Sequence, residues 1–415
     1  MGVEERMDRK KINIGTYYLA PYASTEEHVK DLAECGIDMI VNMRNDKAAL
    51  DLFSKYGVGA MVTGILPGWF GGNGSNAGTM SVANPMEKYE QASIGFTDHP
   101  AIWGIDTGDE PSALDFPYYG QIFDRVREGF PGKIPYLNIY PSYGVKGSNT
   151  PLEIDEQLGV EDYPAYIRSF CENVVSDYIC FDYYLYSADL SGLYESLCVV
   201  SKACQKYERQ MWIVLQVNSH QEDTWISTDQ LRFQAYSAMA FGAEVIIWAC
   251  YCAGWWYNHV LDKQGNKTPQ YEKLKTVNAE VHALSDEYMK YTHAETYFVG
   301  DFSEEEVRKT DKSVMCELNT DRFKELKVTP GHKLIVGLRR YDHSVGEKKE
   351  VKEALMICSA DDPYDKQSTV GRISFCAKGK VRALGRSDMQ PLIQNEDGSY
   401  SLEIRPNEGI LIVEE

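Results

Sequence analysis

The sequence of 415 residues predicts a (β/α)8 barrel, also called a TIM barrel, followed by a small all-β, sandwich-like domain. Through the first ~290 residues, apolar β-type runs alternate with helical patterns, which favours a parallel α/β architecture. Eight βα units of roughly 35 residues each match a barrel of ~250–300 residues. From Glu295 onward, alternating strands are separated by turns rich in Gly, Asp and Asn, as in small all-β domains.

The alternation places eight strands and their helices in order along the barrel. Strands are expected at 12–18, 38–43, 59–66, 101–106, 134–140, 178–184, 211–217 and 244–250, and helices at 26–35, 47–56, 116–129, 190–207 and 228–241. Ser24 or Thr25 begins the first helix and Gly36 ends it, which are ordinary boundary signals. The first strand lacks the GxGxxG turn of a dinucleotide-binding fold, so a doubly wound sheet is the weaker alternative.

The β-rich tail is predicted to be a domain of its own. Its strands are expected at 333–338, 354–358, 372–377, 400–404 and 409–414. We therefore expect a barrel over residues 1–293 and a β-sandwich-like domain over 294–415. Within the barrel, the long loop from Gly68 to Ala83 has the length of an active-site flap.

Composition narrows the class of partner. The 62 acidic residues outnumber the 42 basic ones, and the resulting charge of −20 repels phosphate backbones and anionic lipids. We therefore expect a neutral substrate, with no nucleic-acid or membrane partner. The charged N-terminus has no apolar signal region, and the ten cysteines are scattered through apolar segments, so a cytoplasmic protein with reduced thiols is expected. The HExxH and paired CxxC motifs are absent, so no metal is expected, and the absence of a GxSxG elbow disfavours serine-hydrolase chemistry. No other cofactor is expected.

The end of the fourth strand carries the sharpest chemical signal. In a barrel, function lies at the C-terminal ends of the strands, and here the segment 103–111 reads WGIDTGDEP. Strict alternation turns Trp103 and Ile105 toward the helices, and Asp106 and Glu110 toward the barrel interior. A carboxyl group held at that position among aromatic side chains would have a raised pKa, as a general acid requires. The alternative is a helix start, with acids in the first turn and Pro at its first position.

The longer segment from His99 to Pro111, HPAIWGIDTGDEP, resembles the HP-x-x-x-G-…-DEP segment of clan A-like glycoside hydrolases, including relatives of the family 42 β-galactosidases. The segments 181–184 (FDYY) and 232–242 (RFQAYSAMAFG) extend the similarity more weakly. In these families the Glu that ends the fourth strand is the general acid/base. The resemblance therefore implies a glycosidase in which Glu110 has that role.

The sequence departs from these families at the seventh strand. Clan A enzymes carry a nucleophilic Glu there, whereas this chain has Gln216, which cannot form a glycosyl-enzyme ester. We favour Asp182, expected to point inward on strand six, as the second carboxylate; it could instead be a buried acid bonded to tyrosine hydroxyls. Glu222 or Asp223, just past strand seven, is a second option.

Three further interpretations stay open. In the first, the substrate's own acetamido oxygen attacks, oriented by Asp109 beside the acid Glu110, an arrangement similar to hexosaminidases with an adjacent Asp-Glu pair on strand four. In the second, the barrel binds carbohydrate without cleaving it, because Gln216 replaces the usual nucleophile. The third is a different barrel hydrolase or lyase that would use Asp106, Asp109 and Glu110.

Aromatic and polar residues at the strand ends are the expected substrate-binding groups, since rings stack on sugars and amides bond their hydroxyls. They are Tyr17, Asn42, Trp69, Asp106, Asn138, Tyr140, Tyr184, Gln216, Asn218, His220, Trp248, Tyr251, Trp255 and Trp256. The run from Trp255 to Tyr257 lies in a predicted loop, where it would bind carbohydrate or form the interface of a homo-oligomer.

Overall fold

The computed structural model describes residues 7–69, 77–91, 98–145, 157–252, 254–345, 348–365 and 369–415. Its internal contacts divide the chain into two units. The barrel unit comprises Met1–Arg9, Asn13–Trp225 and Val245–Lys275, and the C-terminal unit comprises Lys10–Ile12, Ile226–Glu244 and Thr276–Glu415. The boundary between residues 293 and 294 stays a prediction. None of the described helices is long and apolar enough to cross a membrane.

Eight parallel strands form one closed sheet, in the order β5-β4-β3-β2-β1-β8-β7-β6. They are β1 (Asn13–Tyr17), β2 (Met39–Arg44), β3 (Gly59–Thr63), β4 (Ile102–Asp109), β5 (Ile134–Asn138), β6 (Tyr178–Tyr183), β7 (Gln210–Gln216) and β8 (Ala243–Ala249). A parallel bridge between Ile139 and Phe181 joins the two ends of the sheet. The predicted (β/α)8 barrel is confirmed, with strand ends within a few residues of those expected.

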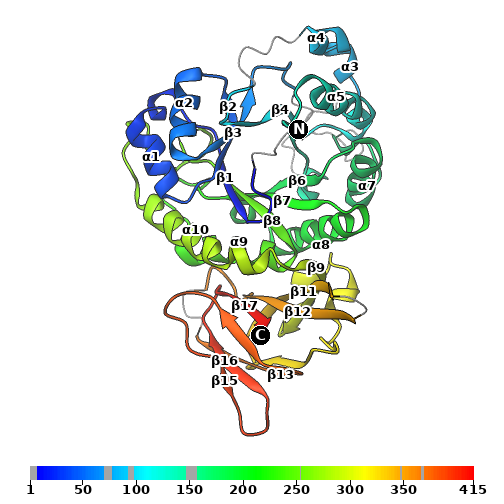
Figure 1. Cartoon of the computed structure of the whole chain (residues 1–415), viewed down its shortest axis with the longest axis vertical. Coiled ribbons are helices and arrows are strands. Elements are labelled where there is room, and N and C mark those ends of the chain that lie inside the picture. Colours follow the sequence, from blue (N-terminus) through cyan, green and yellow to red (C-terminus); the bar gives the residue numbers. More distant parts are fainter. Residues whose placement is uncertain are drawn as a thin grey trace. The chain divides into compact units, whose positions relative to one another are not determined.

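In Figure 1, the helices of the barrel unit lie around its strands. Along the chain, nine α-helices of the described residues lie between the eight strands or directly after β8. They are α1 (Glu26–Glu34), α2 (Lys47–Tyr56), α3 (Met80–Ala83), α4 (Met86–Glu90), α5 (Phe116–Gly129), α7 (Tyr163–Asn173), α8 (Leu190–Tyr207), α9 (Thr228–Ala240) and α10 (Pro269–Tyr288). Local chemistry sets their ends. In α2, the Asp46 side chain accepts hydrogen bonds from the backbone N–H groups of Ala48 and Ala49, and Gly57 ends the helix at φ 73°.

The barrel interior is filled by alternate residues of the strands. This cluster includes Met39, Val41, Met61, Ile134, Tyr136, Tyr178, Cys180, Trp212, Val214, Val245 and Ile247. Trp103 packs against the same cluster, so the prediction that it faces the helices is wrong. The pairing of β3 with β4 shifts by one residue just before Gly104, and this bulge turns Trp103 inward. Gly59 leaves room for the ring, since a Cβ there would lie 2.0 Å from it.

The C-terminal unit contains two antiparallel sheets, in the orders β14-β17-β12-β11-β9 and β10-β13-β16-β15. The strands are β9 (Thr292–Gly300), β10 (Phe323–Val328), β11 (Lys333–Val345), β12 (Lys348–Ser359), β13 (Gly371–Ala377), β14 (Val381–Leu384), β15 (Ile393–Gln394), β16 (Tyr400–Ile404) and β17 (Gly409–Glu414). The predicted all-β architecture is confirmed. β11 and β12 are longer than expected, and β9, β10, β14 and β15 were not predicted.

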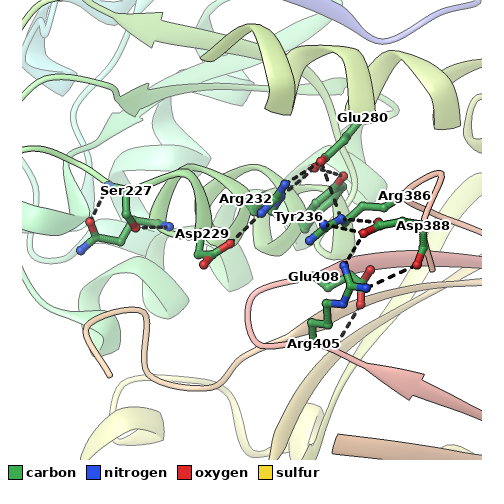
Figure 2. Close-up of polar contacts among 10 residues, drawn as sticks. Ser227, Asp229, Arg232, Tyr236, Glu280, Arg386, Asp388, Arg405 and Glu408 are labelled. Atoms are coloured by element: carbon green, nitrogen blue, oxygen red, sulfur yellow. Dashed lines mark hydrogen bonds and ion pairs between the residues drawn. The ribbon is translucent and has the colours of Figure 1, made fainter. Parts of the chain in front are cut away.

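Helix α9 also lies in the C-terminal unit, where its side chains belong to a network of arginines and carboxylates (Figure 2). The Arg232 guanidinium donates two hydrogen bonds to the Glu280 carboxylate, at 2.8 and 2.7 Å, and a third to Asp229 at 2.7 Å. Nearby, Asp388 accepts hydrogen bonds from Arg386 and Arg405. Bidentate arginine pairs of this kind are among the stronger polar contacts in proteins.

Candidate active site

A cluster of carboxyl groups lies at the C-terminal ends of β4, β5 and β6, with Asn138 of β5 at its centre. The Asn138 side-chain amide donates to Asp109 Oδ1 at 3.0 Å and to Asp182 Oδ1 at 2.9 Å. The Asn138 backbone carbonyl accepts the N–H of Glu110 at 2.9 Å. One asparagine therefore ties together the three acids that the sequence singled out for chemistry, and both Asn138 and Asp182 point inward as expected.

The carboxyl groups of Glu110 and Asp182 are hydrogen-bonded to each other. Burial, followed by the charges of Asp182 and Asp109, raises the pKa of Glu110 well above its ordinary value. Burial also raises the pKa of Asp182, but hydrogen bonds from Asn138, Tyr143 and Glu110 to its carboxylate oppose that rise. Of the two carboxyl groups, Glu110 is therefore the one that keeps its proton, and its O–H donates the hydrogen bond to the Asp182 carboxylate.

Two further carboxyl groups of β4 have raised pKa values. Burial raises the pKa of Asp106 to about 7, although a hydrogen bond of 3.0 Å from the Gly108 N–H opposes it. Burial and then the charge of Asp182 raise the pKa of Asp109 to about 7. The pKa values of all four acids are shifted mainly by burial, by the charges of the other acids and by hydrogen bonds from neutral donors. No cation is among the main causes. No group of the described residues has the arrangement of a metal site.

The backbone is strained at Glu110 and at residues of three other barrel strands or the segments after them. Glu110 has φ 44°, and Tyr18 after β1, Asn42 in β2 and Trp256 after β8 also have positive φ values, at 58°, 54° and 70°. Non-glycine residues in this region are uncommon and gather at functional sites. In β4, the pairing with β5 shifts between Asp106 and Asp109. This bulge lets Asp109 and Glu110, which are neighbours in the chain, both reach the cluster, which strict alternation forbids.

Gln216, at the expected position of the nucleophile, is fully buried and engaged by the protein itself. Its amide nitrogen donates to Ser187 Oγ at 3.2 Å and to the Asn218 carbonyl at 3.0 Å, while its oxygen accepts the Tyr186 N–H at 2.9 Å. The side chain therefore fastens the segment after β6 to the end of β7.

Asn218 has a similar task in the segment after β8. Its amide donates to the Trp255 carbonyl at 2.8 Å, and its oxygen accepts the Cys250 N–H at 2.7 Å. The predicted binding residues Gln216 and Asn218 thus link the loops at these strand ends, because their polar atoms are hydrogen-bonded to loop residues of the protein itself.

An aromatic group joins the ends of β1, β6, β7 and β8. Trp256 contacts the rings of Tyr184, His220 and Trp255, with centroid distances of 4.7, 3.9 and 6.3 Å, and Tyr17 lies 6.0 Å from Trp255. Trp255 is 38% exposed, so its ring is available to a ligand. The structure therefore brings together five of the predicted aromatic and histidine positions.

The other predicted binding residues are placed differently. Trp69 lies beside the cluster, since its carbonyl accepts the Asp109 N–H at 2.9 Å. Tyr140 is buried close enough to Glu110 for that charge to raise its pKa. Trp248 and Tyr251 are fully buried: Trp248 lies between the inward-facing Ile247 and Ala249, hence on the other side of β8.

Two loop predictions have partial outcomes. Of the predicted flap at 68–83, residues 70–76 lie outside the described part of the chain, and the last four residues form α3. Glu222 and Asp223, the alternative second carboxylates, are exposed, and neither is among the main influences on the pKa of Glu110.

Sequence reasoning missed Tyr143. It follows β5 in a short 3-10 helix, Ser142–Val145, and its hydroxyl donates to Asp182 Oδ2 at 3.1 Å. Asp182 is therefore a buried acid bonded to a tyrosine hydroxyl, as one of the two readings of the sequence anticipated, and it also faces Glu110. The only signal for Tyr143 in the sequence is its position just after a predicted strand end.

Comparisons with known proteins add structural similarity at low identity. No family model matches the chain, and no curated protein matches its sequence. Among solved structures, it is similar to a putative α-L-fucosidase from Bacteroides thetaiotaomicron, with 12% identity over 67% of this chain and 99% of that chain and a TM-score of 0.47. A glucosidase from Croceicoccus marinus has 10% identity over 96% and 94% of the two chains, with a TM-score of 0.45. A glycoside hydrolase family 5 mannosidase from Rhizomucor miehei has 13% identity over 66% and 94%, with a TM-score of 0.45.

Proposed function

We propose that this chain is a glycoside hydrolase in which Glu110 protonates the departing glycosidic oxygen. The observation that carries the proposal is the hydrogen-bonded pair of Glu110 and Asp182. A general acid must hold its proton near neutral pH, and burial together with two neighbouring acids raises the pKa of Glu110. Glu110 is also only partly buried, so a substrate oxygen has access to it.

Asp182 is the favoured second carboxylate. It is 1% exposed, and Asn138 and Tyr143 each donate to one of its oxygens. Glycosidase carboxyl groups are separated by ~5 Å for retention or ~6.5–9.5 Å for inversion, so a substrate has to part the pair on entry. The proton of Glu110 would then pass to the leaving oxygen as the bond to the anomeric carbon breaks, and the freed Asp182 would stabilise the positive charge that develops. Water would bond to the anomeric carbon, and the proton that it loses would restore the acid form of Glu110.

The second candidate is a substrate-assisted reaction on N-acetylhexosaminides. It is favoured by Asp109, which is partly buried, adjacent to Glu110 in the chain and held by Asn138. The substrate's acetamido oxygen would bond to the anomeric carbon while Glu110 protonates the leaving oxygen, and Asp109 would face the acetamido N–H. Water would then open the cyclic intermediate and return the proton to Glu110.

The substrate class follows from the surroundings of the acids. The pKa of Glu110 is shifted mainly by burial and by neighbouring acids, not by a cation, and the whole protein has a charge of −20. Both features disfavour an anionic sugar. The aromatic group around Trp255 and Trp256 offers rings on which sugars stack. We therefore propose a neutral glycan as the substrate.

Nitrophenyl glycosides of common hexoses and N-acetylhexosamines, in both anomeric forms, test the proposal. Glu110→Gln should lower kcat by about 10³-fold on a disaccharide, within the range of general acid catalysis. The loss should be smaller on a dinitrophenyl glycoside, because dinitrophenolate departs without a proton. The exposed Glu222→Gln variant is the matched control and should retain activity.

Each result selects one reading. Full activity of Glu110→Gln refutes the assignment. Turnover of simple hexosides favours Asp182 as the second carboxylate, whereas turnover confined to N-acetylhexosaminides favours Asp109. Oligosaccharide binding at the barrel without turnover at any pH identifies a carbohydrate-binding barrel.

A further inference from the structure

A second polar site lies in the C-terminal unit, within that unit alone. A pocket of about 610 Å³ opens where β9, β11 and β12 meet the chain leading into β10 and the residue after β13. Its volume is in the range of small-molecule sites, ~300–1,000 Å³. The residues that carry its chemistry are Glu295, Asn319, Asp321, Arg322, Arg340, Glu353 and Lys378.

Part of this lining is held rigidly by the fold. Glu353 is 4% exposed and accepts hydrogen bonds from Arg340 Nε at 3.1 Å and from the Thr320 hydroxyl. Arg322 donates to the Val351 carbonyl at 3.0 Å and lies 3.4 Å from the Glu414 carboxylate. These groups are therefore oriented before any ligand arrives, which lowers the entropic cost of binding.

Other lining groups are free to meet a ligand. Within the described residues, the side chains of Asn319, Asp321 and Lys378 have no hydrogen-bond or ion-pair partner. They offer an amide, an acceptor and a donor on the same rim. The charges of the lining balance, because it contains three cations, Arg322, Arg340 and Lys378, and three carboxylates, Glu295, Asp321 and Glu353.

We propose that this pocket binds a neutral saccharide unit. Hydroxyl groups both donate and accept, so vicinal hydroxyls suit a lining that combines carboxylates, cations and an amide. An anionic ligand would meet three carboxylates as well as the overall charge of −20, and a cationic one would meet two arginines and a lysine. The site is independent of the chemistry proposed for the barrel.

Calorimetric titration of the full-length Glu110→Gln protein with neutral tetrasaccharides, namely cellotetraose, mannotetraose and a β-galactotetraose, tests this site. The double variant Asp321→Ala/Lys378→Ala should lose one binding event, or weaken it at least tenfold, while its melting temperature stays unchanged. The matched control Lys380→Ala/Glu396→Ala alters two exposed charges outside the lining and should bind as before.

The outcomes separate this site from the barrel. A binding event that persists unchanged in the Asp321→Ala/Lys378→Ala protein belongs elsewhere and overturns the proposal, as does the absence of binding to every neutral tetrasaccharide. An event lost in that variant but insensitive to raising NaCl from low to high concentration supports a neutral ligand. Preferential, salt-sensitive binding of a tetra-uronate would overturn the ligand class. None of these results depends on whether the barrel hydrolyses glycosides.

Discussion

Carboxyl groups gather in both units, and their partners differ. Those at the ends of β4 and β6 in the barrel unit are half-buried or buried, whereas in the C-terminal unit Glu280 is half-buried and Asp388 is exposed. In the barrel unit, Asp109 and Asp182 share one asparagine amide, and Glu110 faces another acid. In the C-terminal unit, Glu280 receives two hydrogen bonds from Arg232, and Asp388 is bonded by two arginines (Figure 2). The first cluster concentrates negative charge, whereas the second neutralises it.

This difference indicates that the arginine-paired acids of the C-terminal unit stabilise the fold, whereas the acids of the barrel unit are suited to chemistry. Pairing with arginine favours the ionised form of an acid, since a hydrogen bond from Arg405 lowers the pKa of Asp388. It also links elements distant in the chain, as Arg232 and Glu280 link α9 and α10. Acids without a cation have raised pKa values and reduce stability once they ionise, a cost that is expected at functional sites. Burial can outweigh the effect of neighbouring arginines. The pKa of Glu408 is raised by burial, although Arg405 and Arg386 act to lower it.

The largest expected effect comes from Asp182→Asn. We expect kcat to fall by about 10³-fold, within the range for a lost acid/base partner. Removing this like charge also lowers the pKa of Glu110, so the acid loses its proton at a lower pH. The basic limb of the kcat/KM profile should therefore move to lower pH. A loss of activity with an unmoved limb would return Asp182 to a purely structural role.

Gln216→Glu tests whether the barrel cluster tolerates a further acid. The substitution removes two donated hydrogen bonds and sets a carboxylate against the Asn218 carbonyl, in a fully buried position. We expect a stability loss of about 3 kcal/mol in urea denaturation and no gain in activity. Higher turnover in this variant would show that strand seven can supply a nucleophile after all.

Glu280→Gln probes the arginine network. Arg232, whose side chain is 9% exposed, would keep Asp229 but lose its bidentate partner. We expect the free energy of unfolding to fall by about 2 kcal/mol, somewhat below the effect of breaking a fully buried pair. Glu34→Gln, which removes half of an exposed pair with Lys30, is the control and should change stability by less than about 0.5 kcal/mol. If the two substitutions lowered the free energy of unfolding equally, the arginine network would contribute no more to stability than an exposed ion pair.

The smallest effect is expected from Asp106→Asn, and it has the opposite sign. Because the folded-state pKa is about 7, the folded protein holds this proton more tightly than the unfolded chain does. Stability contributed by Asp106 is therefore complete below its ordinary pKa near 4 and is lost as the pH rises through 7. The variant should unfold at a higher temperature than the parent at pH 8 and match it at pH 4. We expect a difference of about 1 kcal/mol in stability at pH 8, because water near this half-buried carboxyl group offsets most of the ~4 kcal/mol to which a rise of about three in pKa corresponds. A variant that is less stable at pH 8 would contradict the raised pKa.

The sequence alone predicted much of the barrel, because strand and helix periodicities are local. The helices over 47–56, 116–129 and 190–207 begin and end as expected, and Glu110 was located from its place after a strand. The prediction for Trp103 failed because a bulge depends on pairing with a neighbouring strand, which alternation within one strand does not reveal.

Only the tertiary structure decided how the acids act on one another. Asn138 and Asp182 are 44 residues apart, and Tyr143 reaches Asp182 across 39, so neither contact has a local signature. The residue type of Gln216 was enough to rule out a glycosyl-enzyme ester. Its hydrogen bonds to Tyr186 and Ser187, however, could not be predicted from the sequence. Residue types and periodicity determine which groups lie at the strand ends. Their pKa values and partners depend on burial and on distances of a few ångströms, which arise only when the strands close into a barrel.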